Sequence, residues 1–367
     1  MHILIVTPRY FPFMGGVESH VYETARRMAS RERVTVLTTD PSGQLTPEET
    51  MEGVNIIRVP AMPADRDYYL APELVRVIAR KDWDVIHVQS YHTLVAPLAM
   101  LAALRAKIPY VVTFHGGGHS SNLRNAARKF QRALLRPLLA RAARLVTLAN
   151  FERDFFIRQL KLPLEKFVTI PNGADLPVLN ESVEPMPDET WIASIGRLER
   201  YKGHQRVIAA LPFLLERKPD VRLWIAGTGP YESELQRLAL ELGVADRIHI
   251  AAIPSHDRMR MAREIKRMAL VVLLSEYETH PIAVLEALSL KRAVLVAETS
   301  GLQELVTRGQ ARGVPLNSTP QQVARAMWEQ LEHPFVPDIF TLPTWDECAQ
   351  SLLQLYHTVV RRNECVF

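Results

Sequence analysis

Short apolar runs alternate with helical patterns along almost all of the 367 residues. Near the N-terminus the run HILIVT is followed by a loop at 8–16, an amphipathic helical pattern at 17–28 and the run VTVLTT. Further apolar runs occur at 56–59, 85–89 and 110–114, with helical patterns between them. Apolar runs of this length between helices are typical of buried parallel strands. The alternation therefore predicts an α/β fold, with ligands bound beyond the carboxyl ends of the strands.

The alternation is interrupted at 176–189, where three prolines occur without a periodic pattern, and we interpret this segment as a linker. A second series follows, with the runs WIASI, VRLWIA, IHIAAI, ALVVLL and AVLVA. Near its end, Ser300 and Gln303 are spaced as a capping box for a helix at 302–306. The chain is long enough for two cores. We predict one domain at 1–176, a second at 188–335, and a C-terminal amphipathic helix within 336–367.

Cysteine content and hydropathy bear on the compartment. The two cysteines, Cys348 and Cys365, are too few for a disulfide framework. The segment HILIVTPRY has neither a basic region before it nor a cleavage site after it, so we interpret it as a first strand and not a signal peptide. Apolar runs stay below the roughly 18 residues that a membrane-spanning helix needs. We therefore expect a cytoplasmic protein.

Charge is unevenly distributed, although the net charge of +4 is small. Between Asp84 and Glu152 there is no Asp or Glu, whereas nine Lys or Arg occur. Seven of them lie at 123–145 among several leucines, which predicts a basic amphipathic helix or helix pair, interrupted near Pro137. Two interpretations stay open. The segment is either the solvated face of a core helix, or a surface for an anionic membrane or acceptor, which would place the protein peripherally at the inner face of the membrane.

Two loops of the first series have residues suited to ligands. Gly15 and Gly16 precede a predicted helix, where glycine lets backbone amides approach a phosphate, although such a pair also occurs in plain turns. His115 follows the strand at 110–114 and precedes three glycines. A histidine there is either a hydrogen-bonded structural residue or a ligand contact.

In the second series, Arg197 follows the strand WIASI and Lys202 comes five residues later, at the start of a helix predicted at 204–215. Two cations between a strand end and a helix N-terminus form a site for a diphosphate. On an isolated surface the same cations would contribute little.

The stretch 274–290, LSEYETHPIAVLEALSL, predicts a strand end, a loop at 275–280 and a helix with Pro281 in its first turn. Glu286 lies within the apolar helix, where a carboxylate is costly unless it is hydrogen-bonded, so we predict a partner for it. Glu278, in the loop, brings a second carboxylate near the same helix end. A polyhydroxylated ligand can engage both.

Taken in order, these motifs resemble those of the fourth family of glycosyltransferases, also described as glycosyl transferases group 1. Family members are retaining enzymes that use nucleotide sugars. The resemblance implies the GT-B fold, in which two Rossmann-like domains face each other across a cleft and a C-terminal helix crosses back to the first domain. The motifs that carry it are Gly15-Gly16 followed by Glu18, His115-Gly116, Asn172-Gly173, Arg197 with Lys202, and Glu278 with Glu286.

The resemblance also implies residue roles. His115 and Glu278 would contact the donor sugar, and Arg197 and Lys202 would stabilise charge on the leaving diphosphate. Glu286 would hold the ribose. We expect the remaining donor contacts from the following residues: Gly15, Gly16, Thr279, His280 and Pro281. In the common family form a Gly, an aromatic residue and then Gly or Pro follow the first Glu, so Thr279-His280-Pro281 leaves the donor sugar open.

The expected reaction is transfer of a hexose from a nucleoside diphosphate sugar to a hydroxyl of a sugar or lipid-linked acceptor, in polysaccharide, lipopolysaccharide or glycolipid assembly. No protein nucleophile is evident, which fits the family's route, in which the leaving phosphate takes the acceptor's proton. We expect no nucleic acid partner and no metal or other cofactor. Asp-x-Asp occurs at Asp65–Asp67 and Asp82–Asp84, but Asp84 precedes its strand, at the end opposite to ligands.

Two other classes share part of this pattern. A non-catalytic sugar-nucleotide-binding protein would have nearly the same sequence. A nicotinamide-dependent Rossmann oxidoreductase would share the alternation of strands and helices. However, Gly227-x-Gly229 is followed by Glu232 where the third glycine of the dinucleotide fingerprint would stand.

Overall fold

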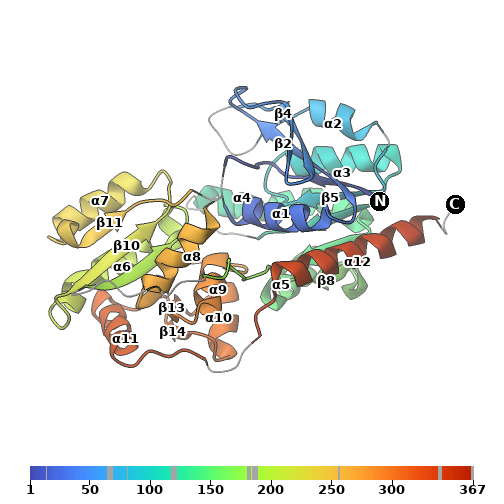
Figure 1. Cartoon of the computed structure of the whole chain (residues 1–367). Helices are drawn as coiled ribbons and strands as arrows, with labels where there is room; N and C mark the ends of the chain where they lie inside the picture. The colour runs from blue at the N-terminus through green and yellow to red at the C-terminus, as the bar shows by residue number, and fades with distance from the viewer. Residues whose placement is uncertain are drawn as a thin grey trace. The chain divides into compact units, whose positions relative to one another are not determined.

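The computed structural model describes residues 1–13, 15–63, 69–80, 82–116, 122–179, 183, 189–254, 257–337 and 341–364, without the side chains of 122–127, 129, 363 and 364. Most of the predicted linker, the Asp65–Asp67 motif, the glycines at 117 and 118, and Cys365 lie outside these residues. The chain divides into two compact units (Figure 1). The first contains Met1–Gly116, Ser121–Gly173 and Pro343–Phe367, and the main part of the second is Ala174–Leu342.

The first unit is built on an eight-stranded sheet of order β3-β4-β2-β1-β5-β6-β7-β8. All neighbouring strands are parallel except β3 and β4. The polar edge strand β3 was not predicted, because its sequence EETM has no apolar run. The strand order reverses between β1 and β5, and ligands of such sheets bind where it does. The strands are β1 His2–Val6, β2 Arg33–Asp40, β3 Glu48–Met51, β4 Val54–Pro60, β5 Val85–Gln89, β6 Tyr110–Thr113, β7 Arg144–Thr147 and β8 Phe167–Thr169.

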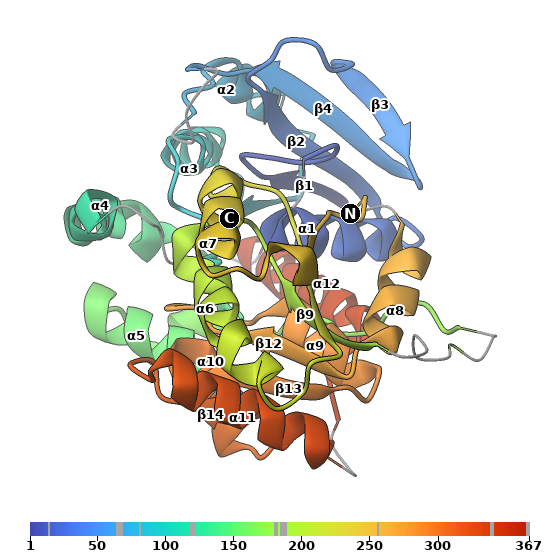
Figure 2. The ribbon, with the colours of Figure 1, turned by 90° about the vertical axis from the view of Figure 1, so that its left-hand side faces the viewer.

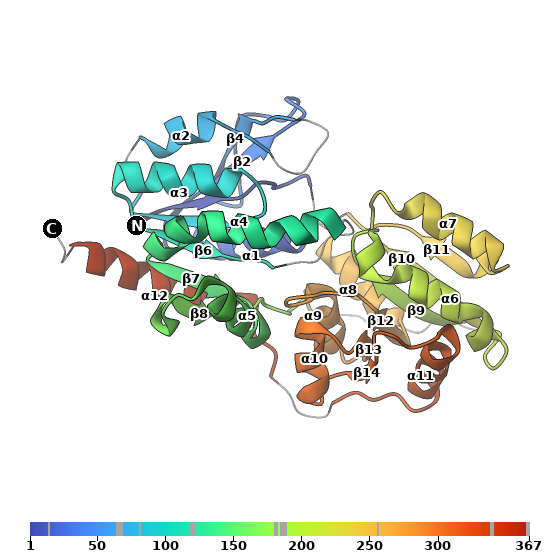
Figure 3. The same ribbon diagram turned by 180° about the vertical axis from the view of Figure 1, so that it is seen from behind.

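Helices cover both faces of this sheet. Helices α1 and α12 pack against one another on one face, while α2, α3, α4 and α5 follow each other on the other face (Figures 1 and 3). Helix α4 continues through Pro137, so the expected interruption is wrong. Leu135 and Leu139 on either side of the proline are buried in the core and hold both halves in one helix. The helices are α1 Gly16–Met28, α2 Glu73–Ile78, α3 Val95–Ala106, α4 Asn122–Arg141, α5 Asn150–Leu160, the 3-10 helix Leu164–Lys166 and α12 Trp345–Glu364.

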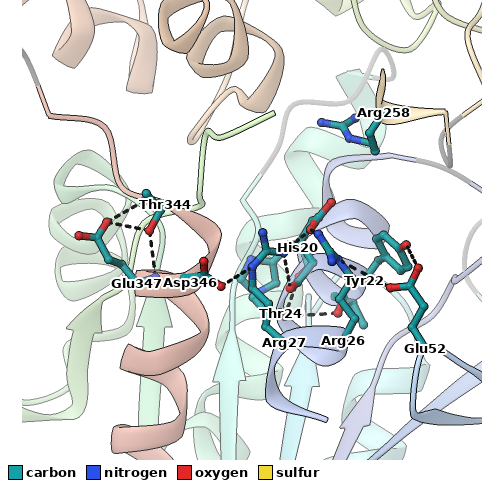
Figure 4. Close-up of polar contacts among 12 residues, drawn as sticks. His20, Tyr22, Thr24, Arg26, Arg27, Glu52, Arg258, Thr344, Asp346 and Glu347 are labelled. Carbon is teal, nitrogen blue, oxygen red and sulfur yellow. Dashed lines mark hydrogen bonds and ion pairs between the residues drawn. The ribbon is translucent and has the colours of Figure 1, made fainter. Parts of the chain in front are cut away.

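The C-terminal helix α12 belongs to the core of the first unit. It begins with a capping box, in which Thr344 Oγ1 accepts from the N–H of Glu347 at 3.1 Å and the Glu347 carboxylate accepts from the N–H of Thr344 at 2.8 Å (Figure 4). Arg27 of α1 donates to Asp346 at 2.8 Å. A Cβ on Gly173 would lie 2.3 Å from the Trp345 nitrogen, so only glycine fits there.

The second unit is a six-stranded, fully parallel sheet of order β11-β10-β9-β12-β13-β14. The order reverses between β9 and β12. Helix α6 packs against α7 and α11, and α8 packs against α9 (Figure 2). The α/β fold class with two parallel-sheet units is confirmed. The strands are β9 Thr190–Ile195, β10 Val221–Ala226, β11 Ile248–Ile250, β12 Leu270–Leu273, β13 Ala293–Ala297 and β14 Arg312–Val314. The helices are α6 His204–Leu215, α7 Glu232–Glu241, α8 Arg258–Arg267, α9 Ile282–Ser289, α10 Ser300–Thr307, α11 Pro320–Glu332 and the 3-10 helices Arg200–Lys202 and Ala245–Arg247.

Candidate functional site

Two loops of the second unit meet where the strand order reverses. One follows β9 and ends at Lys202, and the other follows β12 and contains Glu278. The Lys202 ammonium lies 2.6 Å from Glu278 Oε1, and the Ser275 hydroxyl donates to the same oxygen at 2.9 Å. Burial disfavours the charged form of Lys202, but the Glu278 carboxylate outweighs it, so the pKa of Lys202 is raised. The structure therefore joins a cation and a carboxylate that are 76 residues apart.

Gly203 makes the close contact between the Lys202 loop and the Glu278 loop sterically possible. Its φ is +78°, and a Cβ at this position would lie 2.1 Å from the carbonyl oxygen of Leu274. No other residue fits so close to a backbone oxygen in the left-handed region. The glycine thus lets the start of α6 contact the end of β12, which places the neighbouring Lys202 beside the second loop.

Helix α10 fixes the loop that contains Glu278. The Glu278 N–H donates to Ser300 Oγ at 2.8 Å, and the Gly301 N–H donates to the carbonyl of Glu278 at 2.8 Å. The predicted capping box of Ser300 with Gln303 is wrong, because α10 has Thr299 as its N-cap residue and the Ser300 hydroxyl accepts from Glu278 instead. The start of α10 is therefore part of the site.

Glu286 is 3% exposed within α9, and its predicted partner exists. The guanidinium of Arg258, at the start of α8, donates to its Oε1. Sequence reasoning missed Arg258, because the only signal was that a carboxylate in an apolar helix needs a partner. Helix α9 begins at Ile282, with Pro281 as N-cap. The two glutamates thus lie on either side of the start of α9, each held by a cation of the same unit.

The other predicted donor contacts of this unit are less closely grouped. Thr279 is buried, and His280 beside it is half-buried. The Arg197 side chain is 45% exposed and its guanidinium contacts Tyr201 Oη at 3.2 Å and Glu199 at 3.4 Å. Arg197 therefore lies in the same loop as Lys202 but on its solvent side.

In the first unit, His115 follows β6 with a φ of +45°, which is uncommon for a residue with a side chain. Its Nε2 lies 2.6 Å from Gln89 Oε1, and its ring centroid is 4.8 Å from that of His20. Burial, together with the nearby His20 and His87, holds the pKa of His115 well below its ordinary value. His115 is therefore a neutral imidazole at physiological pH.

Gly15 and Gly16 lie at the start of α1, after β1. Gly15 is the extended N-cap residue of α1. Among the described residues, no atom lies within 4 Å of a Cβ placed on Gly16, so this glycine is not explained by packing. The Glu18 carboxylate of the first turn lies at this helix start, because its Oε2 would be 2.6 Å from a Cβ placed on Gly15.

Glu152 is a further residue that sequence reasoning missed. It is fully buried in α5, and its two oxygens accept from the N–H groups of Gly116 at 2.6 Å and Leu148 at 2.8 Å. It thereby holds the backbone directly after His115. The only signal in the sequence was its place at the end of the acid-free segment.

The stability contribution of Glu152 should depend on pH. Burial raises its pKa from 4.5 to about 7 and outweighs the two N–H donors, which favour the ionised form. The folded chain then holds a proton that the unfolded chain loses between these values, so this contribution is present below pH 4.5 and is lost as pH rises towards 7. The corresponding free energy is about 3 kcal/mol. Urea unfolding of the native chain and of the Glu152→Gln variant measures the free energy of unfolding of each. The difference between the two proteins should fall by this amount as pH rises from 4.5 to about 7. A difference that grows with pH would contradict it.

No metal cluster is apparent among the residues that the structure describes, in the sense that no three His, Cys, Asp or Glu side chains are grouped as ligands. The Asp84 carboxylate of the second Asp-x-Asp accepts from the N–H of His2 at 2.7 Å. Within the described residues, no helix combines the length and apolarity needed to cross a membrane.

Comparison with known proteins gives matches over both units. A family model described as Glycosyltransferase Family 4 matches residues 14–177, and one described as Glycosyl transferases group 1 matches residues 179–337. The GDP-mannose:cellobiosyl-diphosphopolyprenol alpha-mannosyltransferase of Xanthomonas oryzae is 29% identical over 299 residues, which cover 79% of this chain and 76% of that protein. The phosphatidyl-myo-inositol mannosyltransferase of Mycolicibacterium smegmatis is 27% identical over 380 residues, which cover 98% of this chain and 94% of that protein.

Among solved structures, sucrose-phosphate synthase from Thermosynechococcus elongatus superposes with a TM-score of 0.80 at 19% identity, over 98% of this chain and 99% of that one, which shows a shared fold. A non-catalytic binding protein and a nicotinamide-dependent oxidoreductase are not favoured by these matches. The chain is thus a glycosyltransferase of the GT-B fold and belongs to glycosyltransferase family 4, with a second half of the glycosyl transferases group 1 type.

Proposed function

We propose that the second unit binds a nucleoside diphosphate sugar and that the enzyme transfers its hexose to a hydroxyl acceptor with retention of anomeric configuration. The contact between Lys202 and Glu278 carries this proposal, because it places a phosphate-binding cation beside an acceptor for sugar hydroxyls where the strand order reverses. Glu286, on the adjoining helix, is suited to the ribose hydroxyls. The name of the Xanthomonas relative specifies GDP-mannose, which supports a nucleotide-sugar donor here.

In the proposed reaction, the bond between the anomeric carbon and the diphosphate oxygen breaks while the acceptor oxygen bonds to the same face of that carbon. The acceptor's proton passes to the leaving phosphate. Lys202 and Arg197 donate hydrogen bonds as charge grows on the diphosphate, each contributing roughly 1.5 to 3 kcal/mol. His115 accepts a hydrogen bond from a sugar hydroxyl, which its neutral imidazole can do. Thr279, His280 and Pro281 line the sugar, and the amides after Gly15 and Gly16 approach the phosphate.

The experiment that tests this function screens GDP-, UDP- and ADP-sugars for thermal stabilisation and then follows the product. A donor at a hundred times its dissociation constant adds about 2.7 kcal/mol to stability. With the matching donor we expect slow release of free nucleotide without acceptor, and an NMR spectrum of the product with the donor's anomeric configuration. Inversion at that carbon would contradict the retaining route, and stabilisation without turnover would leave a binding protein.

We propose that turnover needs no divalent metal, because Lys202, Arg197 and a helix N-terminus meet the charge of the diphosphate. Activity is therefore expected to persist after treatment with EDTA and gel filtration, within about twofold of the untreated enzyme. Added Mg²⁺ and Mn²⁺ serve as the comparison. Complete loss in EDTA with recovery in Mn²⁺ would show that a cation carries this role.

We also propose an amphiphilic, lipid-linked acceptor that the enzyme meets peripherally at the cytoplasmic face of an anionic membrane, through α4. Phe130 and Leu134 on this helix are 76% and 66% exposed, and Pro137 and Arg141 extend the same face at helical spacing. Exposed apolar side chains with neighbouring arginines are typical of interfacial helices. The names of the two relatives specify cellobiosyl-diphosphopolyprenol and phosphatidyl-myo-inositol, which supports a lipid-linked acceptor.

Not every cation of this segment is available to a membrane. The Arg132 guanidinium lies 5.2 Å from the Phe155 ring centroid and 3.4 Å from Gln159 Oε1, so it packs within the unit. The Arg136 side chain donates to the Leu160 carbonyl at 2.7 Å, which ties α4 to α5. The exposed apolar pair is therefore the sharper target for mutation.

Changing both Phe130 and Leu134 to Ser should weaken binding to anionic vesicles at least tenfold, because burying each such side chain contributes about 1.5 to 3 kcal/mol. Co-sedimentation at low and high salt measures this. Leu240→Ser is a matched control, because Leu240 is 71% exposed on α7 of the second unit. Equal binding by the double variant and the native chain, or no binding by either, would leave a soluble acceptor as the better proposal.

A further inference from the structure

His115 is connected to the C-terminal helix by a series of buried hydrogen bonds within the first unit. Gln89, the last residue of β5, contacts His115 on one side and His87 on the other. His87 in turn contacts the hydroxyl of Tyr356 on α12. Gln89, His87 and Tyr356 are at most 2% exposed, and none of them has a part in the proposed reaction.

We propose that Gln89 is a positioning residue that fixes the tautomer of His115, and that Tyr356 of α12 holds Gln89 and His87 in this arrangement. The inference rests on the proposed function only in assuming that His115 contacts a sugar hydroxyl.

The hydrogen-bonding capacity of each group decides where the protons lie. The oxygen of the Gln89 amide only accepts, so His115 Nε2, 2.6 Å away, carries the hydrogen. The amide nitrogen of Gln89 lies 3.1 Å from His87 Nδ1 and 3.4 Å from His87 Nε2, so it packs against the ring between the two nitrogens. The Tyr356 hydroxyl lies 2.5 Å from His87 Nδ1, and Thr113 Oγ1 lies 2.7 Å from His87 Nε2, so each ring nitrogen of His87 has a hydroxyl partner.

With its hydrogen on Nε2, neutral His115 keeps Nδ1 as the acceptor nitrogen. It can then receive a hydrogen bond from a hydroxyl, whereas the other tautomer would present an N–H at Nδ1 and repel the same hydroxyl hydrogen. Burial and the neighbouring histidines keep the ring uncharged, so the tautomer and not the charge is what Gln89 sets. The hydrogen bond at Nε2 also fixes the orientation of the His115 ring. Metal-binding histidines are oriented in the same way, by a partner at the nitrogen that does not bind the metal.

The packing of α12 explains why Tyr356 contributes. Tyr356 is fully buried, and Trp345 at the start of α12 lies against Gly173. Arg27 of α1 donates a hydrogen bond to Asp346 in the first turn of α12 (Figure 4). Because α12 is held at its first turn, the Tyr356 hydroxyl contacts His87 of β5 at a fixed place. A helix distant in sequence from His115 thereby influences its ring.

The first test needs no ligand. Ring 15N NMR of histidine-labelled protein, with the His115 signal identified from its loss in His115→Gln, should show a single tautomer protonated at Nε2. In Gln89→Met, which keeps the side-chain volume without the amide, we expect a mixture of tautomers. Tyr356→Phe should shift the spectrum in the same direction by less. An unchanged His115 tautomer in Gln89→Met would overturn the proposal.

The second test is kinetic. Gln89→Met should lower kcat about tenfold with the donor KM within about threefold, and Tyr356→Phe should lower kcat about threefold. Tyr110→Phe is the matched control, because Tyr110 is buried in the same unit and its hydroxyl donates to the carbonyl of Leu138, at 2.5 Å, outside the series. Equal losses in the two tyrosine variants would remove Tyr356 from the proposal.

The two tests separate the inference from the proposed function. A changed tautomer with an unchanged kcat would overturn the role of Gln89 in the reaction, while loss of activity in Lys202→Ala would still support the donor site. Full activity in Lys202→Ala would instead contradict the donor site and leave the tautomer result standing.

Discussion

Replacing Lys202 by Ala is expected to lower kcat about 100- to 1000-fold, the loss that follows removal of one donor to a developing oxyanion. The ammonium would meet charge that grows on the leaving phosphate, so its interaction is stronger in the transition state than with the bound donor. The donor KM should rise by a smaller factor, because the ground-state diphosphate also contacts the cation. Initial rates at varied donor concentration separate the two constants.

Lys218→Ala is the control for this variant. Lys218 belongs to the same unit and pairs with Asp220 at 3.5 Å, on the loop before β10 and away from the carboxyl ends of the strands. Its loss should change neither constant measurably, since partly exposed pairs contribute about 0 to 1 kcal/mol. If Lys202→Ala changed only the KM, the role assigned to this cation in the transition state would be wrong.

Features set by local sequence were predictable. The buried strands and amphipathic helices follow from apolar spacing, so β5 at Val85–Gln89 and α6 at His204–Leu215 have the predicted bounds. That Lys202 and Glu278 lie in loops after strands was also predictable, because each segment follows an apolar run. That they touch depends on β9 and β12 being neighbours, and the sequence carries no direct signal of strand order.

Partners distant in the chain were not predictable. Ser300 has the spacing of a capping residue, yet its hydroxyl accepts from Glu278, 22 residues earlier. Nothing in the sequence near Glu152 marks it as the acceptor for the Gly116 amide. In each case the two partners come together only after folding, so the local sequence does not identify the contact.

The ion pair of Glu286 and Arg258 gives the second large effect. Glu286→Ala is expected to raise the donor KM about 100-fold, because a carboxylate that holds two ribose hydroxyls contributes roughly 3 kcal/mol or more. The kcat should change by less than about threefold, since ribose contacts are alike in the ground and transition states. The donor KM should be measured for donors that carry different bases. The same rise for each base would show that the lost contact is to the ribose.

Arg258→Ala should act on stability as well as on binding. The Glu286 side chain is 4% exposed, and removing the guanidinium from a carboxylate this deeply buried typically costs about 3 to 5 kcal/mol. The double variant should recover much of that loss, because it removes the buried charge together with its cation. Urea unfolding of the four proteins measures the coupling, and simple additivity would show that the pair does not stabilise the unit.

A large coupling would mean that Arg258 keeps Glu286 in place before the donor arrives, so the donor's ribose must share or replace that guanidinium. Arg258→Ala should then change the donor KM even in buffers where the variant is fully folded.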